Sequence, residues 1–267
     1  MATFGLIAGG GGFPLLFARS ARRAGHRVVA AAHLRQTDPA LERAVDACTW
    51  VKLGQFGKVV EALQAGGAEQ VVMLGNVTKA RFFLDAFPDA LGLELMRRTF
   101  IRSDDNLLRT SARMLEERGL PVVDPTAFLE GALAREGVLG RHQPTEAELE
   151  DARYGLTLAR AIGQLDLGQT VVVKDRCGVA VEALEGTDAC IARGGELAGA
   201  GTVVVKAVKP QQDRRFDLPA VGPRTIESMR KARCRVLAVE AGSTLVMDLP
   251  ELLRLADKAG IAVVGLR

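Results

Sequence analysis

The chain has 267 residues, of which 48% are hydrophobic and 25% are charged, and its formal net charge is +3. This balance excludes a mainly disordered chain, because there is enough apolar surface to offset the entropy that is lost on ordering. Aromatic residues make up only 4%, which disfavours the stacking surfaces of proteins that bind single-stranded nucleic acid. We therefore expect no nucleic-acid partner.

The amino-terminal residues 1–8 have neither the basic segment nor the long apolar segment of a signal peptide. No apolar run in the sequence reaches the length of about 18 residues that is typical of a membrane-spanning helix. The four cysteines lack the CxxC spacing of zinc sites and do not suggest a disulfide framework. These features predict a cytoplasmic protein, with contact at a membrane surface left open.

Short apolar runs alternate with helical segments in the first half of the chain. A strand is expected at 4–8, and it ends at four glycines. Pro14 then begins a helix at 15–24, a position that favours proline. The next expected elements are a strand at 27–32, a helix at 56–65 and a strand at 70–74. Because such alternation indicates a doubly wound parallel sheet, the sequence predicts an N-terminal Rossmann-like domain over residues 1–132.

The middle of the chain is less regular. Helical segments at 82–101 and 103–118 precede a short strand at 121–123, and the stretch 131–144 shows no periodicity. We therefore expect a linker over residues 133–145. Thr145, with Glu148 three residues later, predicts a capping box at the start of a helix at 146–165. Further strands are expected at 170–174, 179–183, 202–207, 236–239 and 263–265, and helices from 187 and at 225–232 and 249–259. The prediction is a C-terminal α/β catalytic domain, 146–267.

The first candidate site is the run Gly9, Gly10, Gly11 and Gly12, between a strand and a helix. Backbone N–H groups can approach a phosphate closely there, and the helix N-terminus adds positive potential. The dinucleotide fingerprint G-x-G-x-x-G is incomplete, because Pro14 occupies its third glycine position. An anionic ligand is favoured over a tight turn without a ligand. Binding of NADP through Arg35 stays an alternative.

Polar residues gather at three further places. Asn76 follows an expected strand, and Thr187 and Asp188 lie in an acidic strand-to-helix turn, where either residue could instead cap the helix. The densest stretch runs from 206 to 219 and includes four candidates, Lys209, Gln212, Asp213 and Asp217. Carboxylates suit Mg²⁺, and lysine suits phosphate oxygens. The alternative for this stretch is a solvated charged loop.

The spacing of the histidines excludes a metal-binding histidine pair. His26, His33 and His142 are the three histidines of the chain, and none is spaced as part of a metal-binding pair. Any hydrolysis would therefore run without a histidine cluster, which points to Mg²⁺ held by carboxylates and a water nucleophile.

Several motifs together resemble the LpxI family of UDP-2,3-diacylglucosamine pyrophosphatases, which act in lipid A biosynthesis. They are, in chain order, GLIAGGG at 5–11, GQFGK at 54–58, GNV at 75–77, DDNLLR at 104–109, GQ at 168–169, VEALEGTDA at 181–189, KP at 209–210 and DLP at 217–219, followed by Gly222. The resemblance covers nearly the whole chain.

The resemblance implies two α/β domains with a lipid product held between them. It implies Mg²⁺-dependent hydrolysis of the substrate's pyrophosphate to UMP and 2,3-diacylglucosamine 1-phosphate. The family's essential aspartate corresponds to Asp217 here, and Asp213 is the second expected metal ligand. The expected substrate contacts are Gly9, Gly10, Gly11, Gly12, Asn76, Thr187, Asp188, Lys209 and Gln212.

Two other functions stay open, an oxidoreductase with a non-classical Rossmann half and a nucleotide-sensing binding module. The partner that the resemblance implies is the UDP-linked diacylated glucosamine. Because this substrate is a lipid, we expect a cytoplasmic enzyme that makes transient contact with the cytoplasmic face of the inner membrane. A homodimer is a further open alternative.

Overall fold

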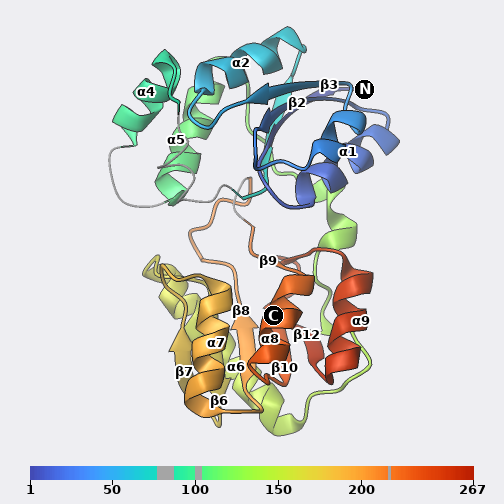
Figure 1. The fold of residues 1–267 in the computed structure, drawn as a ribbon, viewed down its shortest axis with the longest axis vertical. Helices are drawn as coiled ribbons and strands as arrows, with labels where there is room; N and C mark the ends of the chain where they lie inside the picture. Colours follow the sequence, from blue (N-terminus) through green and yellow to red (C-terminus); the bar gives the residue numbers. More distant parts are fainter. Residues whose placement is uncertain (77–86, 100–103, 216–217) are drawn as a thin grey trace. The chain divides into compact units, whose positions relative to one another are not determined.

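The computed structural model describes residues 1–76, 87–99, 104–215 and 218–267. The chain forms two α/β units (Figure 1), which confirms the predicted fold class. The first unit comprises Met1–Glu130 together with Asp213–Asp217, and the second comprises Gly131–Gln212 and Leu218–Arg267. Within the described ranges, no helix combines the length and the apolar character that crossing a membrane requires.

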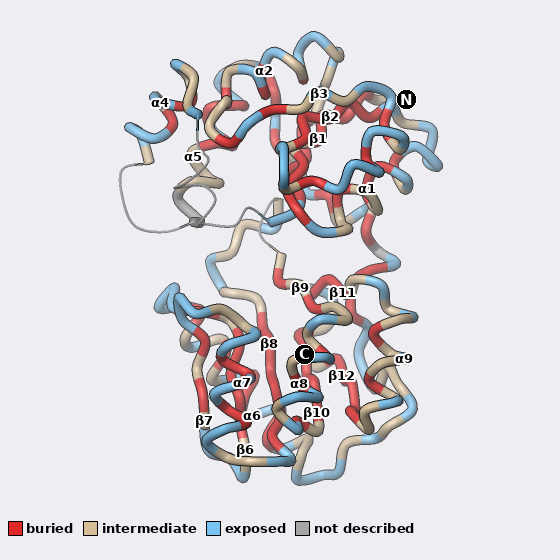
Figure 2. Tube along the Cα trace, viewed as in Figure 1, coloured by how far each residue is buried: buried red, intermediate tan, exposed pale blue. Residues whose placement is uncertain are grey.

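The first unit is built on a four-stranded parallel sheet. Its strands are β1 (Thr3–Ala8), β2 (Arg27–His33), β3 (Ala47–Val51) and β4 (Gln70–Leu74), in the order β3-β2-β1-β4. The inner strands are continuous apolar runs because they are buried on both faces (Figure 2). The helices and 3₁₀ turns of this unit are α1 (Phe13–Arg23), η1 (Pro39–Arg43), α2 (Phe56–Ala65), α4 (Ala90–Arg98), α5 (Asp104–Glu116) and η2 (Thr126–Phe128).

Helical periodicity explains how α2 and α5 pack in this unit. In α2 the buried positions are Phe56, Val59, Val60 and Leu63, which form one face at i, i+3, i+4 and i+7 spacing. Near the end of α5, Met114 and Leu115 are fully buried in the same core. The carboxyl-terminal end of α5 is therefore fixed against the body of the first unit.

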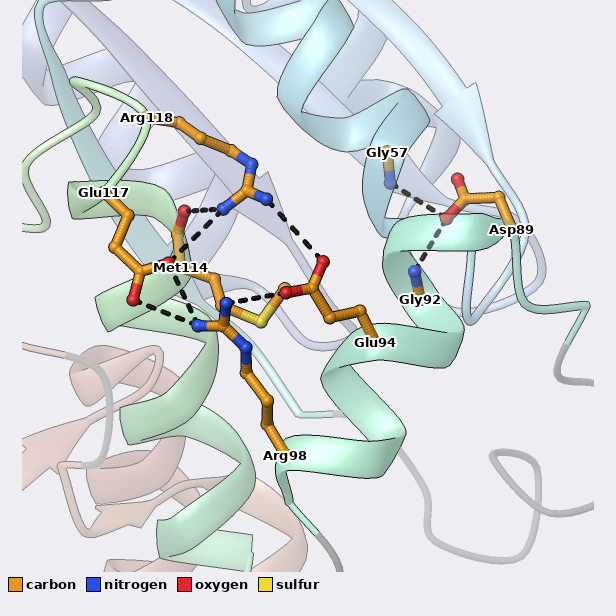
Figure 3. A network of polar contacts seen from close by, with 8 residues as sticks. All are labelled: Gly57, Asp89, Gly92, Glu94, Arg98, Met114, Glu117 and Arg118. Carbon is orange, nitrogen blue, oxygen red and sulfur yellow. Dashed lines mark hydrogen bonds and ion pairs between the residues drawn. The ribbon is translucent and has the colours of Figure 1, made fainter.

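A polar network joins α4 to the end of α5 (Figure 3). Arg98 donates to Glu94 over 2.6 Å and to Glu117 over 2.9 Å, and Arg118 donates to the carbonyl oxygen of Met114 over 2.8 Å. Arg98 thereby neutralises Glu117 at the carboxyl-terminal end of α5, where the helix dipole would otherwise disfavour negative charge. The network thus holds α4 and the last turn of α5 together.

The second unit contains a six-stranded mixed sheet in the order β5-β12-β10-β8-β6-β7. Strands β8, β10 and β12 are parallel to one another, whereas β5, β6 and β7 pair antiparallel with their neighbours. The bounds are β5 (Gly137–Val138), β6 (Thr170–Lys174), β7 (Cys177–Val181), β8 (Val203–Lys206), β10 (Val236–Glu240) and β12 (Ala262–Leu266). A separate parallel pair is formed by β9 (Ala220–Val221) and β11 (Leu245–Val246).

Alternate residues of this sheet face two different helical layers. Val171 and Val173 pack in one core with α6 (Glu146–Gln164), whereas Val172 packs in another with the three later helices. Those helices are α7 (Thr187–Ala198), α8 (Pro223–Lys231) and α9 (Leu249–Ala259). The predicted capping box of α6 is confirmed: Thr145 accepts from the Glu148 N–H, and Glu148 accepts from the Thr145 N–H over 2.7 Å.

The structure differs from the predicted elements in several places. Strand β3 and the turn η1 were not predicted, and neither were the two-residue strands β9 and β11. The stretch expected as a linker, 133–145, contributes the edge strand β5, which pairs with β12. The strand expected at 121–123 is a single bridge between Val71 and Val122. Part of the helix expected at 82–101 lies outside the described residues.

Candidate active site

The predicted glycine turn lies where strand order reverses in the first sheet. Strand β1 is flanked by β2 on one side and by β4 on the other, and the turn after β1 leads directly into α1. In open α/β sheets, ligands bind at this point, beyond the carboxyl ends of the strands. The fold therefore places Gly9–Gly12 and Asn76 at the same edge of the sheet.

The backbones of the two strand ends are in direct contact. The Gly10 N–H donates to the Asn76 carbonyl oxygen over 2.7 Å, and the Asn76 N–H donates to the Gly10 carbonyl oxygen over 3.0 Å. A Cβ at Gly9 would lie 2.7 Å from the Asn76 carbonyl oxygen, and one at Gly75, where φ is +92°, would lie 2.6 Å from the Gly10 carbonyl oxygen. Only glycine fits this close approach.

The start of α1 has the features of an anion-binding helix terminus. Gly12 occupies the N-cap position without a side-chain cap, and the first turn contains no acidic residue. A Cβ built at Gly11 meets nothing within 4 Å. The Gly9 and Gly10 N–H groups donate to the carbonyl oxygens of Leu74 and Asn76. The part of the turn that is open to a phosphate is therefore the start of α1 at Gly11 and Gly12, where the helix dipole would also favour an anion.

A partly buried histidine, His33, lies at the same edge of the sheet, at the end of β2. The His33 N–H donates to the Thr37 hydroxyl over 3.0 Å, and that hydroxyl donates to the carbonyl oxygen of Ala8 over 2.6 Å. The ring atom Nδ1 of His33 and the Nε2 of Gln36 are buried without a hydrogen-bond partner. Burial lowers the pKa of His33 to about 4, so the imidazole is neutral at neutral pH.

This burial gives a testable pH dependence. In the unfolded chain the His33 pKa is near 6.5, so the unfolded state binds more protons between pH 6.5 and 4. The contribution of neutral His33 to stability is therefore complete above pH 6.5 and is lost as the pH falls to 4, by about 3 kcal/mol. Urea unfolding followed by the fluorescence of Trp50, the single tryptophan, should show this loss in the wild type and not in His33→Gln. The control is His142→Gln, in the second unit. If the free energy of unfolding depended on pH in the same way in wild type and in His33→Gln, the lowered pKa of His33 would be contradicted.

In the second unit, Thr187 lies at the centre of a buried polar cluster. Its hydroxyl donates to Glu182 Oε1 over 2.7 Å and accepts from Lys206 Nζ over 3.1 Å. Glu182 and Lys206 are 8% and 7% exposed, and Thr170 is fully buried with its hydroxyl 3.4 Å from that of Thr187. Gly186 holds the N-cap position of α7 without a side-chain cap, so the alternative role of Thr187 or Asp188 as helix cap is wrong.

The Thr187 hydroxyl links two charges that would each be costly to bury without hydrogen bonds. Thr187→Val keeps the shape of the side chain and removes the hydroxyl, so it should lower the free energy of unfolding by about 1–3 kcal/mol. Thr187→Ser should restore most of the loss. Calorimetry of purified variants measures this, with Thr157→Val on the exposed face of α6 as the control, expected within about 0.5 kcal/mol of wild type. If Thr187→Val and Thr157→Val were equally stable, the stabilising role of the Thr187 hydroxyl between Glu182 and Lys206 would be refuted.

Lys206 and Glu240 end two neighbouring parallel strands, β8 and β10, and both are buried. Glu240 accepts from Arg160 over 2.7 Å and from the Val208 N–H over 2.9 Å. Sequence reasoning noted Glu182 and Lys206 within larger stretches but did not select either as a site residue. The available signal was a lysine that ends an otherwise apolar strand.

The remaining candidates of the second unit make local contacts. Lys209 pairs with Asp166 over 2.7 Å, and Gln212 accepts from the Lys209 N–H over 3.0 Å. The Nε2 of Gln212 is buried without a hydrogen-bond partner. Asp188 accepts from Arg224 and Ser228. Its contacts therefore join α7 to α8, whereas those of Thr187 lead into the buried cluster.

The two predicted metal ligands lie close together in the sequence. Asp217 lies outside the described residues. Asp213 accepts from Arg215 through both carboxylate oxygens, and this hydrogen bonding is the main cause that lowers the Asp213 pKa. Among the residues that the structure describes, no group of three or more His, Cys, Asp or Glu side chains could hold a metal ion.

Comparisons with known proteins place the chain in a family. The model of the LpxI N-terminal domain matches residues 3–132, and that of the LpxI C-terminal domain matches residues 135–264. A protein of Caulobacter vibrioides named UDP-2,3-diacylglucosamine pyrophosphatase LpxI is 36% identical over 277 aligned residues, which cover 99% of this chain and 98% of that protein.

Solved structures give a much weaker similarity. One is the biotin carboxylase domain of a thermophilic 2-oxoglutarate carboxylase with ADP, 14% identical with a TM-score of 0.28, where 64% of this chain covers 35% of that chain. Another is N5-carboxyaminoimidazole synthetase from Staphylococcus aureus with ADP, 15% identical with a TM-score of 0.25, covering 64% and 37%. Nothing about this chain follows from likeness at that level. The two domain models and the near-full-length relative agree, and they show that the chain belongs to the LpxI family.

Proposed function

We propose that this chain is a UDP-2,3-diacylglucosamine pyrophosphatase of lipid A biosynthesis that requires Mg²⁺ and releases UMP and 2,3-diacylglucosamine 1-phosphate. One observation carries the proposal: the relative that bears this activity in its name is 36% identical over 99% of the chain. A shared activity is the simplest reason for similarity that extends through both domains.

The reaction sets requirements that the described residues can be compared with. A water oxygen forms a bond to one phosphorus, the bond between that phosphorus and the bridging oxygen breaks, and the water releases a proton. Charge on the phosphate oxygens has to be neutralised, and the water has to be positioned. The amides at the start of α1 suit phosphate oxygens. In the second unit, Lys206 is a buried cation whose ammonium donates to the Thr187 hydroxyl.

Asp217 is the carboxylate that we assign to the chemical step, because it stands in the D-L-P segment that carries the essential aspartate in the family resemblance. Bound Mg²⁺ would supply charge neutralisation at the phosphate oxygens. Asp213, the second predicted ligand, is engaged by Arg215, so a metal ion would compete with that arginine for the same oxygens.

The proposed substrate carries two acyl chains and therefore resides in a membrane. We propose that the protein is cytoplasmic and contacts the cytoplasmic face of the inner membrane transiently, when it takes up this lipid. Sedimentation with vesicles that contain the substrate, compared with vesicles that lack it, measures this contact. Equal sedimentation of the protein with both kinds of vesicle would contradict membrane contact that depends on the substrate.

The deciding experiment measures products. Purified protein is incubated with UDP-2,3-diacylglucosamine in detergent micelles, and UMP and the lipid phosphate are quantified by mass spectrometry. Equal amounts of the two products are expected. Binding of the lipid nucleotide without turnover would favour the binding module, and a fluorescence change on titration with NADPH would favour the oxidoreductase.

A further inference from the structure

Helix α4 exposes large apolar side chains on the side that faces away from its own core. Leu95 is buried, and Leu91 packs against the same core. Leu93 is two residues from each of them, a rotation of about 200° around the helix, and it is 56% exposed. Met96 and Phe87, which precedes the helix, are also exposed, by 41% and 59%. Because large apolar side chains that gather on a surface mark an interaction site, Phe87, Leu93 and Met96, which we call the α4 face, call for a partner.

Basic side chains border the α4 face. Arg97 is exposed in the last turn of α4, one turn after Leu93. Before the helix, Lys52 is exposed, and its Nζ lies 4.4 Å from the centre of the Phe87 ring. The whole chain also carries a formal net charge of +3. The charges therefore favour a partner that is both apolar and negatively charged.

The two acidic residues of the stretch 87–99 are engaged by donors of the first unit (Figure 3). Asp89 accepts from the N–H groups of Gly57 over 3.1 Å and of Gly92 over 2.8 Å. Glu94 accepts from Arg98 over 2.6 Å. These contacts compensate the negative charges and also fix α4 to its unit. A rigid helix therefore presents the α4 face, and the charge that borders it is positive.

From these observations we infer that the α4 face is the surface through which the protein docks on an anionic lipid bilayer; this inference rests on the proposed function, which places the substrate in a membrane. The apolar side chains enter the boundary between headgroups and acyl chains, while Lys52 and Arg97 lie against anionic headgroups. So small a surface binds weakly and reversibly, since even one myristoyl chain anchors a protein only marginally. Substrate in the bilayer adds a second, separate contact.

A second copy of the chain fits the α4 face less well than a bilayer does. In a twofold dimer the same patch lies on both sides of the interface. Arg97 and Lys52 would then face the same two cations of the other copy, and like charges across an interface oppose association. An anionic bilayer offers the apolar interior without this repulsion.

Sedimentation with vesicles that lack the substrate tests the surface directly. Phosphatidylcholine vesicles with about 30% phosphatidylglycerol should bind the wild type at about 50 mM NaCl. Removing the phosphatidylglycerol, or raising NaCl to about 0.5 M, should lower the binding constant by about 10-fold or more, because the basic residues then lose their attraction to the surface.

Two pairs of matched variants locate the contact. Leu93→Ser should weaken binding at least about fivefold, whereas Leu197→Ser, at a leucine that is 66% exposed on α7, should leave it unchanged. Arg97→Glu should weaken binding to the anionic vesicles by about 10-fold or more. Arg230→Glu makes the same change in the last turn of α8 and should have little effect. All four positions are exposed, so the melting temperatures should stay near that of the wild type.

Equal binding of the wild type to neutral and anionic vesicles, or equal binding constants for Leu93→Ser and Leu197→Ser, would overturn the inference. A wild type that dimerises in analytical ultracentrifugation, with Leu93→Ser monomeric, would assign the α4 face to a second copy instead. Because these vesicles contain no substrate, the result does not depend on turnover. If the protein binds them but does not hydrolyse the lipid nucleotide, the proposed function alone fails; if it hydrolyses micellar substrate but does not bind them, the inference alone fails.

Discussion

Asp217→Ala is expected to lower turnover of UDP-2,3-diacylglucosamine by at least about 10²-fold, the usual scale for a positioned catalytic group. Alanine removes the carboxylate that we assign to the chemical step and leaves the proposed substrate contacts at the glycine turn and at Thr187 unchanged. The loss should therefore appear in kcat, with a smaller change in KM. Steady-state release of UMP by the purified variant measures both parameters.

Two isosteric substitutions test whether the loss of a negative charge is by itself enough to reduce turnover. Asp217→Asn and Asp175→Asn each remove one negative charge, and Asp175 lies on an exposed turn at φ +51°, a conformation that asparagine tolerates. Only Asp217→Asn should reduce turnover. Near-wild-type turnover of Asp217→Ala, with the fold intact by circular dichroism, would remove Asp217 from the mechanism.

Chelation should abolish hydrolysis, and Mg²⁺ should restore it. A pyrophosphate carries negative charge on both phosphates, and the attack of water on phosphorus is slow until that charge is neutralised. In the described part of the chain, the buried cation Lys206 is already hydrogen-bonded to Thr187. An added divalent ion is therefore expected to be required. Assays in excess EDTA, followed by titration with Mg²⁺, measure the requirement.

The same treatment should leave the fold unchanged. The described residues contain no cluster able to hold a structural metal, so the melting temperature in EDTA should match that in buffer. Full activity in excess chelator would show that side chains and backbone amides neutralise the phosphates without a metal. A fall in melting temperature would point to a structural ion instead.

The elements that the sequence predicted best are those with one strong local signal. The apolar run of β4, the periodic face of α2 and the capping box of α6 each depend on a short stretch of chain. Strand β3 was missed because it is an edge strand, whose residues alternate between exposed and partly buried and form no apolar run. The strands β9 and β11 are two residues long, too short for any periodicity.

The candidate site was predictable only in part. Glycines between a strand and a helix predict an anion-binding turn. The structure places these glycines after β1, where strand order reverses and where ligands bind in open α/β sheets. The cluster around Thr187 depends on β8 lying beside β6, which places Lys206 opposite Thr170. No local pattern shows that pairing. Asp151 illustrates the same limit, because a buried aspartate in α6 is explained only by the turn amides of Asp175 and Arg176 that it accepts from.

The ion pair between Arg215 and Glu116, which is the last residue of α5, has a consequence for how the protein is made. These residues are 99 positions apart, and ribosomes add about 5–20 residues per second. The first unit can therefore form its sheet and bury the end of α5 about 5–20 s before Arg215 has been synthesised. During that interval Glu116 is solvated at the helix terminus. Arg215 then pairs with a helix end that is already folded, so this ion pair is among the late contacts of the nascent chain.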